Sequence, residues 1–450
     1  MQYYPPLQDS NIIDGLRVGY LKFFGFWKII NDYRTTGKKN TFMIFKFYTT
    51  FIISTPYIVP QLFSYFAINM DIEKATIINL HCLPAIMMCG RILVFWVRMD
   101  SQCKLYNLIQ KDFLHIPQYK MAKASIIYRK ITKNANLLCI LAFVMDFSVA
   151  FAIASIPGVP VDYILYHKGS MFDVKTGRKK ILSGWYPLPM DQSPYYEIIF
   201  AYEMVCVLTG GLFQPIYICL FYQVLVALIA QFEVLGYHVS TFNISPNSDI
   251  SQINYNPSAE CSIIDSDSYN QNNINSNSNI SHRKKITSEK SDSDISEDLY
   301  RILQDHQTLL SYADELRSVY NPLVTMNLGL AICFLIVSVF QYQSGETRDI
   351  VFVFKALLFM AAQMIELFMF CFGSSSLQAA SSDLQLAVYS SDWYKADVKL
   401  RKTAQMLMVG AKKGVTLTAI KMYPVNKETL MSIFQFAYST SALMSGMLEK

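Results

Sequence analysis

The sequence predicts an all-α membrane protein with seven transmembrane helices. Hydrophobic residues make up 52% of the 450 residues and charged residues only 16%, against about 25% in soluble domains. The apolar residues are gathered in long blocks. The Lys and Arg content of the segments between those blocks alternates between high and low. These observations predict the fold class and its orientation.

Seven apolar blocks are long enough to cross a membrane, since a bilayer core about 30 Å thick requires about 20 apolar residues in a helix. The first block is uncharged from Phe47 to Met70, and the fifth from Ser318 to Gly345. An odd number of spans places the two termini on opposite sides. The expected spans are residues 44–67, 76–97, 134–156, 200–232, 319–342, 351–372 and 425–447.

The basic residues predict a cytoplasmic N-terminus and an extracellular C-terminus, because cytoplasmic loops are enriched in Lys and Arg. One side carries 26 basic residues, in the N-terminal segment and loops 98–133, 236–318 and 373–413. The other side carries 8, in loops 68–75, 157–199 and 343–350 and at Lys450. This orientation is opposite to that of G-protein-coupled receptors, which excludes that class of seven-helix protein.

The spans and a change in composition divide the chain into five parts. An Asn- and Ser-rich insert at 236–298 cannot bury enough apolar surface to offset its ordering entropy, so we expect disorder there. From Glu297 the apolar residues return at helical spacing and predict one helix that runs into the fifth span. The expected parts are a cytoplasmic segment (1–43), spans 1–4 (44–235), the insert (236–298), spans 5–6 with cytoplasmic helices (299–424) and the last span with a short tail (425–450).

Nothing in the sequence predicts an enzyme, a cofactor or a metal site. There is no Gly-rich phosphate loop and no HExxH motif, and the nine cysteines form no CxxC pair. The net charge of +5 is mild and the basic residues are not clustered, so nucleic-acid binding is not expected.

Three ionisable residues fall inside apolar blocks: Arg91, Asp146 and Glu366. Charges at this depth face protein or water rather than lipid. Arg91 and Glu366 are expected at similar depth, which favours a structural ion pair, with a polar path for ions as the alternative.

The last span is preceded by a break and carries a polar seam. Pro424 ends the helical pattern of Val415–Met422, so Asn426–Met447 should be a separate helix. Small and polar residues recur along one face of that helix, which indicates either packing through small residues or the lining of a pore. The seam consists of Glu428, Ser432, Gln435, Ser439, Ala442 and Gly446.

The C-terminal third resembles the insect odorant receptor family. The resemblance is carried by Asp305–Leu310, Tyr389–Tyr394, Asp397–Lys402, Leu417–Val425 and Thr429–Ile433. It implies a ligand-gated nonselective cation channel of four subunits in the plasma membrane of olfactory sensory neurons, working with a shared coreceptor. By position, Leu443 and Met447 resemble the gate, and Ser432, Gln435 and Ser439 would line the pore.

The resemblance also implies a binding pocket for a small hydrophobic volatile molecule in the outer half of the bundle. Packing residues are the alternative at each position, because the candidates are selected by depth alone. They are His81, Pro84, Met88, Phe147, Phe151, Tyr202, Cys206, Phe352 and Phe359.

Three other readings stay open. The long insert is a feature of the coreceptor, although Pro424 and Thr418-Ala419 resemble the odorant-binding, tuning class. A gustatory receptor subunit shares the topology, but its Thr-Tyr pair is absent at the expected distance from Gln435-Phe436. A transporter is the third reading, without the internal repeats that transporters usually have.

Overall fold

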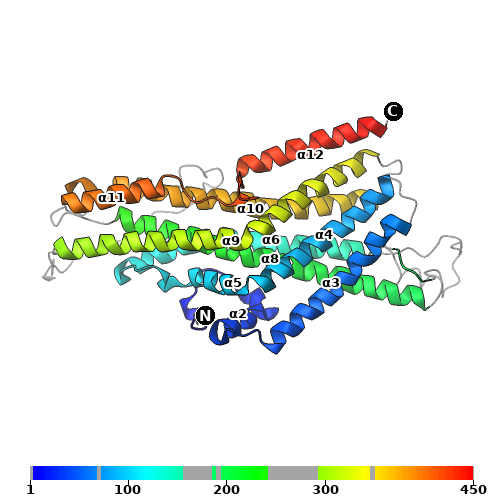
Figure 1. The fold of residues 1–450 in the computed structure, drawn as a ribbon, viewed down its shortest axis with the longest axis horizontal. Coiled ribbons are helices and arrows are strands. Elements are labelled where there is room, and N and C mark those ends of the chain that lie inside the picture. The colour runs from blue at the N-terminus through cyan, green and yellow to red at the C-terminus, as the bar shows by residue number, and fades with distance from the viewer. Residues whose placement is uncertain are drawn as a thin grey trace, which may run out of the picture.

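Long helices run side by side along the longest axis of the molecule (Figure 1). The computed structural model describes residues 4–67, 72–155, 185–188, 194–241, 292–344 and 350–448. Within those ranges, seven helices have 22 residues or more, and each overlaps one of the seven expected spans. They are α3 (Thr41–Ala67), α4 (Ile72–Val97), α6 (Gln118–Ser155), α8 (Tyr195–Ser240), α9 (Asp292–Ser344), α10 (Ile350–Ser390) and α12 (Lys427–Leu448).

Apolar length over the described residues supports four or five of these seven helices as membrane spans. Four helices there are long and apolar enough to cross a membrane: α6, α8, α9 and α10. A fifth candidate is α4 together with residues 99–109, which bend away from it by 79°.

Four helices are much longer than a bilayer requires. At about 1.5 Å per residue, α6, α8, α9 and α10 measure roughly 57 to 80 Å, while the hydrocarbon core is about 30 Å thick. Each extends beyond its expected span on the side predicted to be cytoplasmic. We call that side, with α11 (Val398–Ala411), the inner half, and the opposite side the outer half (Figure 1).

Helix α8 is the central element of the inner half. Every residue from Pro215 to Phe232 is buried, as expected for a helix that is apolar on all faces. Phe221 of α8 contacts the rings of Phe370 on α10 and Tyr320 on α9, with centroids 4.9 and 4.7 Å away. This part of the core therefore lies below the outer half, toward the cytoplasmic ends of the expected spans.

The N-terminal segment is folded against this inner half. Its α2 (Phe26–Thr36) buries Arg34, whose guanidinium donates to the carbonyls of Pro5 and Cys103 and to the side chain of Asn107. The remaining short helices are η1 (Asp9–Asn11), α1 (Gly19–Phe23), α5 (Met99–Leu105), η2 (Tyr106–Ile109), η3 (Lys111–Phe113) and η4 (Trp393–Lys395).

The helix expected from Glu297 into the fifth span is confirmed, because α9 continues without a break from Asp292 to Ser344. The insert, expected to be disordered over 236–298, is helical at both ends, because residues 236–240 belong to α8 and 292–298 to α9, so the prediction is wrong there. Residues 242–291 lie outside the described residues. The expectation of disorder there stays a prediction.

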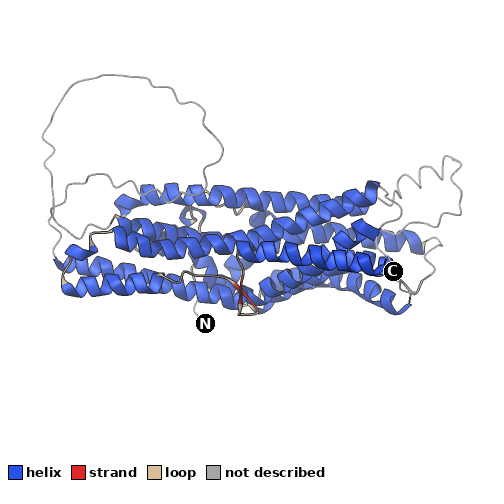
Figure 2. Cartoon of the chain, turned by 90° about the horizontal axis from the view of Figure 1, so that it is seen from above, coloured by secondary structure: helices blue, strands red, loops and turns tan. Residues whose placement is uncertain are grey.

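The helical pattern expected for residues 415–422 is wrong. A small hairpin stands there instead, with β1 (Thr418–Ala419) antiparallel to β2 (Tyr423–Pro424), visible as the strands in Figure 2. The turn residues Ile420 and Lys421 have φ of 54° and 60°. The β-branched side chains of this stretch favour extended backbone, and helical spacing alone does not register that preference.

The expected break before the last span is confirmed. Helix α12 begins at Lys427, after Pro424, and Asn426 caps it by accepting a hydrogen bond from the backbone of Thr429 at 2.9 Å.

Gly211 allows α6 and α8 to approach closely, and its substitution tests this packing. A Cβ at position 211 would lie 2.4 Å from the Cβ of Ala150, whereas one at Gly210 would meet nothing within 4 Å. Gly211→Ala should therefore destabilise the protein by about 1–3 kcal/mol through overpacking. Thermal denaturation of the detergent-solubilised chain measures the loss. Gly210→Ala is the matched control and should be as stable as the wild type. Equal melting temperatures for the two variants would contradict the predicted close contact.

Candidate functional site

A cavity of about 110 Å³ lies in the outer half, between α4, α6, α8, α9 and α10. Its walls are mostly apolar or small residues, and its polar lining residues are Asp146, Gln214, Gln363 and Glu366. The apolar lining consists of Pro84, Ala85, Met88, Val149, Ala150, Ile153, Cys206, Val207, Gly210, Gly211, Phe334, Phe359 and Ala362.

Four of the nine sequence-predicted pocket residues line this cavity: Pro84, Met88, Cys206 and Phe359. They come from three helices, α4, α8 and α10. The structure thus brings together residues that are far apart in the sequence. Their role as ligand contacts stays a prediction.

Three of the other five candidates, Phe147, Phe151 and Tyr202, do not line the cavity. Phe147 and Phe151 are 44% and 60% exposed, because they lie on the face of α6 opposite the lining residues Val149 and Ile153. Tyr202 is half-buried and lies outside the lining. The side chains of the last two candidates, His81 and Phe352, lie outside the described residues.

None of the four polar lining residues was among the predicted pocket residues. Asp146 and Glu366 were predicted only as ionisable residues within the spans, and that depth was the available signal. Gln214 and Gln363 gave no comparable signal. What periodicity did not provide was the rotation of each helix about its axis, which decides whether a residue at a given depth faces the cavity.

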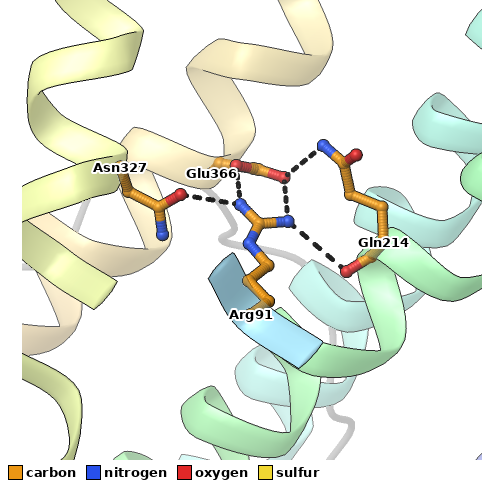
Figure 3. A network of polar contacts seen from close by, with 4 residues as sticks. All are labelled: Arg91, Gln214, Asn327 and Glu366. Atoms are coloured by element: carbon orange, nitrogen blue, oxygen red, sulfur yellow. Dashed lines mark hydrogen bonds and ion pairs between the residues drawn. The ribbon is translucent and has the colours of Figure 1, made fainter. Parts of the chain in front are cut away.

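Arg91 of α4 forms a buried ion pair with Glu366 of α10, so the expected pairing is confirmed (Figure 3). The two guanidinium nitrogens donate to the two carboxylate oxygens at 3.1 and 2.6 Å. The side chains of Arg91 and Glu366 are 0% and 4% exposed. A bidentate pair of this kind fixes both distance and orientation.

Two further helices join the pair. Arg91 also donates to the side-chain oxygen of Asn327 on α9 at 2.9 Å and to the backbone carbonyl of Gln214 on α8 at 3.4 Å. The Gln214 amide donates in turn to Glu366 at 3.4 Å. We call these four residues the Arg91 network. It connects α4, α8, α9 and α10 at the base of the cavity.

Asp146 of α6 lines the same cavity but is not part of this network. Its Oδ2 is buried and has no hydrogen-bond partner among the described residues. The polar end of the cavity therefore combines a carboxylate held by Arg91 with a second carboxylate that has an unused acceptor.

Helix α12 packs with one face and leaves the other exposed. Leu430, Ile433 and Ala437 are buried against the bundle. The described members of the polar seam that follow Glu428 lie on the open face: Ser432, Gln435, Ser439 and Ala442 are all exposed. Their hydroxyls cost little, because Ser432 and Ser439 donate to carbonyls of their own helix.

The two predicted gate residues lie near the end of α12. Leu443 is 61% exposed, while the side chain of Met447 lies outside the described residues. The assignment of both as a gate stays a prediction.

The segment between α11 and α12 is held on both sides by side chains, and we call residues 415–427 the hairpin segment. On α9, three residues spaced four apart bond its backbone: Arg317 to the Thr416 carbonyl (2.8 Å), Asn321 to the Thr418 carbonyl (2.6 Å) and Thr325 to the Ile420 amide (2.8 Å). On α10, three serines accept from its amides: Ser381 from Val415 (2.7 Å), Ser374 from Leu417 (3.0 Å) and Ser375 from Lys427 (3.1 Å). The start of α12 is thereby attached to two of the helices that line the cavity.

Comparison with known proteins identifies similar sequences. A family model described as 7tm Odorant receptor matches residues 81–438. Odorant receptor 85b of Drosophila melanogaster is 26% identical over 152 residues, which are 33% of this chain and 38% of that protein. Odorant receptor 10 of Aedes albopictus is 24% identical over 147 residues, 32% of this chain and 38% of that protein. The match thus spans less than half the length of these curated relatives.

Solved structures match over nearly the whole chain. The insect olfactory receptor OR5 from Machilis hrabei has a TM-score of 0.68 at 13% identity, covering 94% of this chain and 98% of that chain. The same receptor in complex with eugenol has a TM-score of 0.66 at 12% identity, covering 91% and 90%. At such low identity, this similarity demonstrates a shared fold.

The Arg91 network yields a prediction for single and double variants. Arg91→Met leaves Glu366 buried without its counterion, which should cost about 3–5 kcal/mol and lower both surface expression and melting temperature. The double variant Arg91→Met, Glu366→Met removes both charges, so it should recover most of the loss. A single variant that assembles and conducts like the wild type would contradict the structural role of the pair.

Proposed function

The chain belongs to the 7tm odorant receptor family, and from this membership we propose that it is an odorant receptor subunit of a ligand-gated nonselective cation channel. The observation that carries the proposal is the cavity of the outer half together with the partly unpacked face of α12. The cavity would bind the ligand and the open face would line the pore.

The cavity suits a small, mostly apolar molecule. Its volume is about 110 Å³, which is below the volume of about 150 Å³ of an apolar protein cavity that binds benzene and restricts the ligand to a small molecule. The receptor of Machilis hrabei has been solved in complex with eugenol, which supports a volatile ligand for a protein of this fold. Pro84, Met88, Cys206 and Phe359 are the pocket residues that we retain as ligand contacts.

The pore assignment is supported by the chemistry of the exposed α12 face. The exposed side chain of Gln435 makes it costly to turn this face to lipid, although the hydroxyls of Ser432 and Ser439 are satisfied on their own helix. One helix cannot enclose a channel, so several subunits are required. We propose four around a common axis, with the inner halves of the helices holding them together and Leu443 with Met447 as the hydrophobic gate.

The proposed division of the chain follows from these assignments. Residues 44–235 supply most of the ligand-binding outer half, residues 299–424 supply spans 5–6 and the cytoplasmic helices, and residues 425–450 line the pore. We propose the tuning class, acting with an odorant coreceptor in the plasma membrane of olfactory sensory neurons. A gustatory or coreceptor-type subunit is the alternative, and a transporter is a more remote one.

Co-expression tests the proposed function. Cells that express this chain with an insect odorant coreceptor should show cation currents when volatile molecules are applied. Cells that express either chain alone should show no current in response to the same volatiles. Patch-clamp recording over a panel of volatiles measures them. Ligand-evoked current from this chain alone would favour the coreceptor-type alternative. Absence of current in every pairing, with surface expression verified, would refute the channel.

The gate assignment predicts constitutive current in a double variant. Leu443→Ala with Met447→Ala widens the hydrophobic constriction, so that water and ions should enter without ligand. We expect a several-fold rise in ligand-independent current in cells that co-express the coreceptor. Met431→Ala is the control, because Met431 is as exposed as Leu443 (60% and 61%) but lies about three helical turns away from the proposed gate. Unchanged gating and conductance in the double variant would show that the gate lies elsewhere.

A further inference from the structure

The polar end of the cavity carries more acidic than basic groups. Asp146 and Glu366 both line it, and Arg91 is the cation bonded to Glu366 there. With all three groups ionised, their sum is one negative charge in a region of low dielectric. Such an excess is costly, and it is relieved when a carboxyl group is protonated or when a positive group or a strong hydrogen-bond donor is brought to it.

Glu366 is not the group available to an incoming ligand. Both of its oxygens accept from Arg91, and one also accepts from Gln214. The donors that approach it are therefore supplied by the protein itself, from α4 and α8. An additional donor would have to compete with a bidentate guanidinium pair.

Asp146 is in the opposite situation. Asp146 is one of the cavity-lining residues, and its Oδ2 is buried. This oxygen has no hydrogen-bond donor in the described part of the chain. A buried acceptor without a partner carries a penalty that a bound donor would relieve. The fold holds it there firmly, because α6 is packed against α8 at the adjacent Gly211–Ala150 contact.

The apolar walls of the cavity indicate what the rest of a molecule bound at Asp146 would be. Val149, Ala150 and Ile153 follow Asp146 along α6, and Phe334 and Phe359 approach from α9 and α10. An inorganic cation would leave this apolar wall without a partner. A molecule with one cationic donor group and a short hydrocarbon body would satisfy both ends, and about 110 Å³ limits that body to a short chain or a single ring.

We propose that Asp146 recognises the ammonium group of a small aliphatic or monocyclic amine, whose hydrocarbon part lies against the apolar wall of the cavity. This inference rests on the proposed ligand-gated function of the same cavity and adds the chemical class of the ligand. A simple primary amine resembles the Lys side chain, whose pKa is about 10.4, so it is cationic at neutral pH. Its hydrogen bond to a carboxylate is charge-assisted and stronger than a neutral one.

A series of matched ligands tests the proposal. Pentylamine, 1-pentanol and hexane have nearly the same size and differ in the terminal group alone. In cells that express the full chain with a coreceptor, pentylamine should activate at a concentration at least tenfold lower than hexane. The alcohol should lie between them, because its hydroxyl donates without carrying charge.

Asp146→Asn keeps the shape of the side chain and removes its charge. It should raise the half-maximal concentration for pentylamine by about ten- to a hundredfold, the range expected for a hydrogen bond to a charged group, while that for hexane changes little. Val149→Ala, one helical turn away on the same wall, is the matched control and should weaken all three ligands by similar factors.

Binding is measured separately from current, by the shift in melting temperature that each ligand gives the purified full-length chain. Stabilisation by pentylamine that Asp146→Asn abolishes supports the inference even where no current is recorded, and the missing current then counts against the channel function alone.

Normal currents with equal potency of amine and hexane would refute the inference and leave the channel function standing. Equal potency of amine and alcohol would identify a neutral hydrogen-bonding site instead. Stabilisation by sodium or potassium chloride that depends on Asp146 would identify an inorganic cation site, and either outcome overturns the amine proposal.

If Asp146→Asn does not reach the membrane, the wild-type ligand series still decides. The proposal is contradicted without any variant if two results are obtained with the wild-type chain. Pentylamine is less than ten times as potent as hexane in current recordings, and it raises the melting temperature no more than hexane does.

Discussion

The buried pair of Arg91 and Glu366 is the constraint on which the outer half of this protein depends. A lone charge at this depth would be strongly unfavourable, so the two helices that carry the pair must lie at one distance and one register. Asn327 and Gln214 extend the same requirement to α9 and α8. Above the network the helices separate enough to leave a cavity, and below it α8 is buried on every face. The network thus marks the boundary between a hollow outer half and a densely packed inner half.

The helices that line the cavity are also the helices that hold the start of α12. Helices α9 and α10 contribute Phe334 and Phe359 to the cavity wall, and their inner parts bond the hairpin segment through Asn321 and Ser374. Because each is a single helix between these two places, a rotation or tilt produced at the cavity would be carried toward the backbone just before α12. The hairpin segment is short, and side chains hold it from both sides. It therefore has little freedom to absorb such a displacement, and it would connect the cavity mechanically to the proposed pore helix.

The sequence predicted those features that depend on composition along the chain and missed those that depend on direction around a helix. Apolar length located all seven long helices, and basic residues oriented them. Pairing of Arg91 with Glu366 followed from their depth and the cost of leaving either charge alone. The same depth argument selected Phe147 and Phe151, which are exposed, along with Met88 and Phe359, which line the cavity. A residue half a helical turn away from a cavity-lining residue faces away from the cavity. The sequence does not distinguish the two directions, because apolar residues occur on all sides of these helices. The hairpin was missed for a related reason, since its backbone geometry is fixed by side chains of α9 and α10 that are far away in the sequence.

Some polar groups on the membrane helices have hydrogen-bond partners within the protein, and others have none. On α12 the hydroxyls of Ser432 and Ser439 donate to backbone carbonyls of their own helix, so this face can adjoin either protein or the water of a pore. At the polar end of the cavity, Glu366 is saturated by Arg91 and Gln214. Asp146 lies beside this network with a buried acceptor that no described residue satisfies. Buried polar groups are normally hydrogen-bonded, as Glu366 is. An unsatisfied group such as Asp146 beside it is more typical of a functional site than of packing. Stability alone would favour an apolar residue at 146, which agrees with the proposed role of the Asp146 carboxylate in binding a ligand.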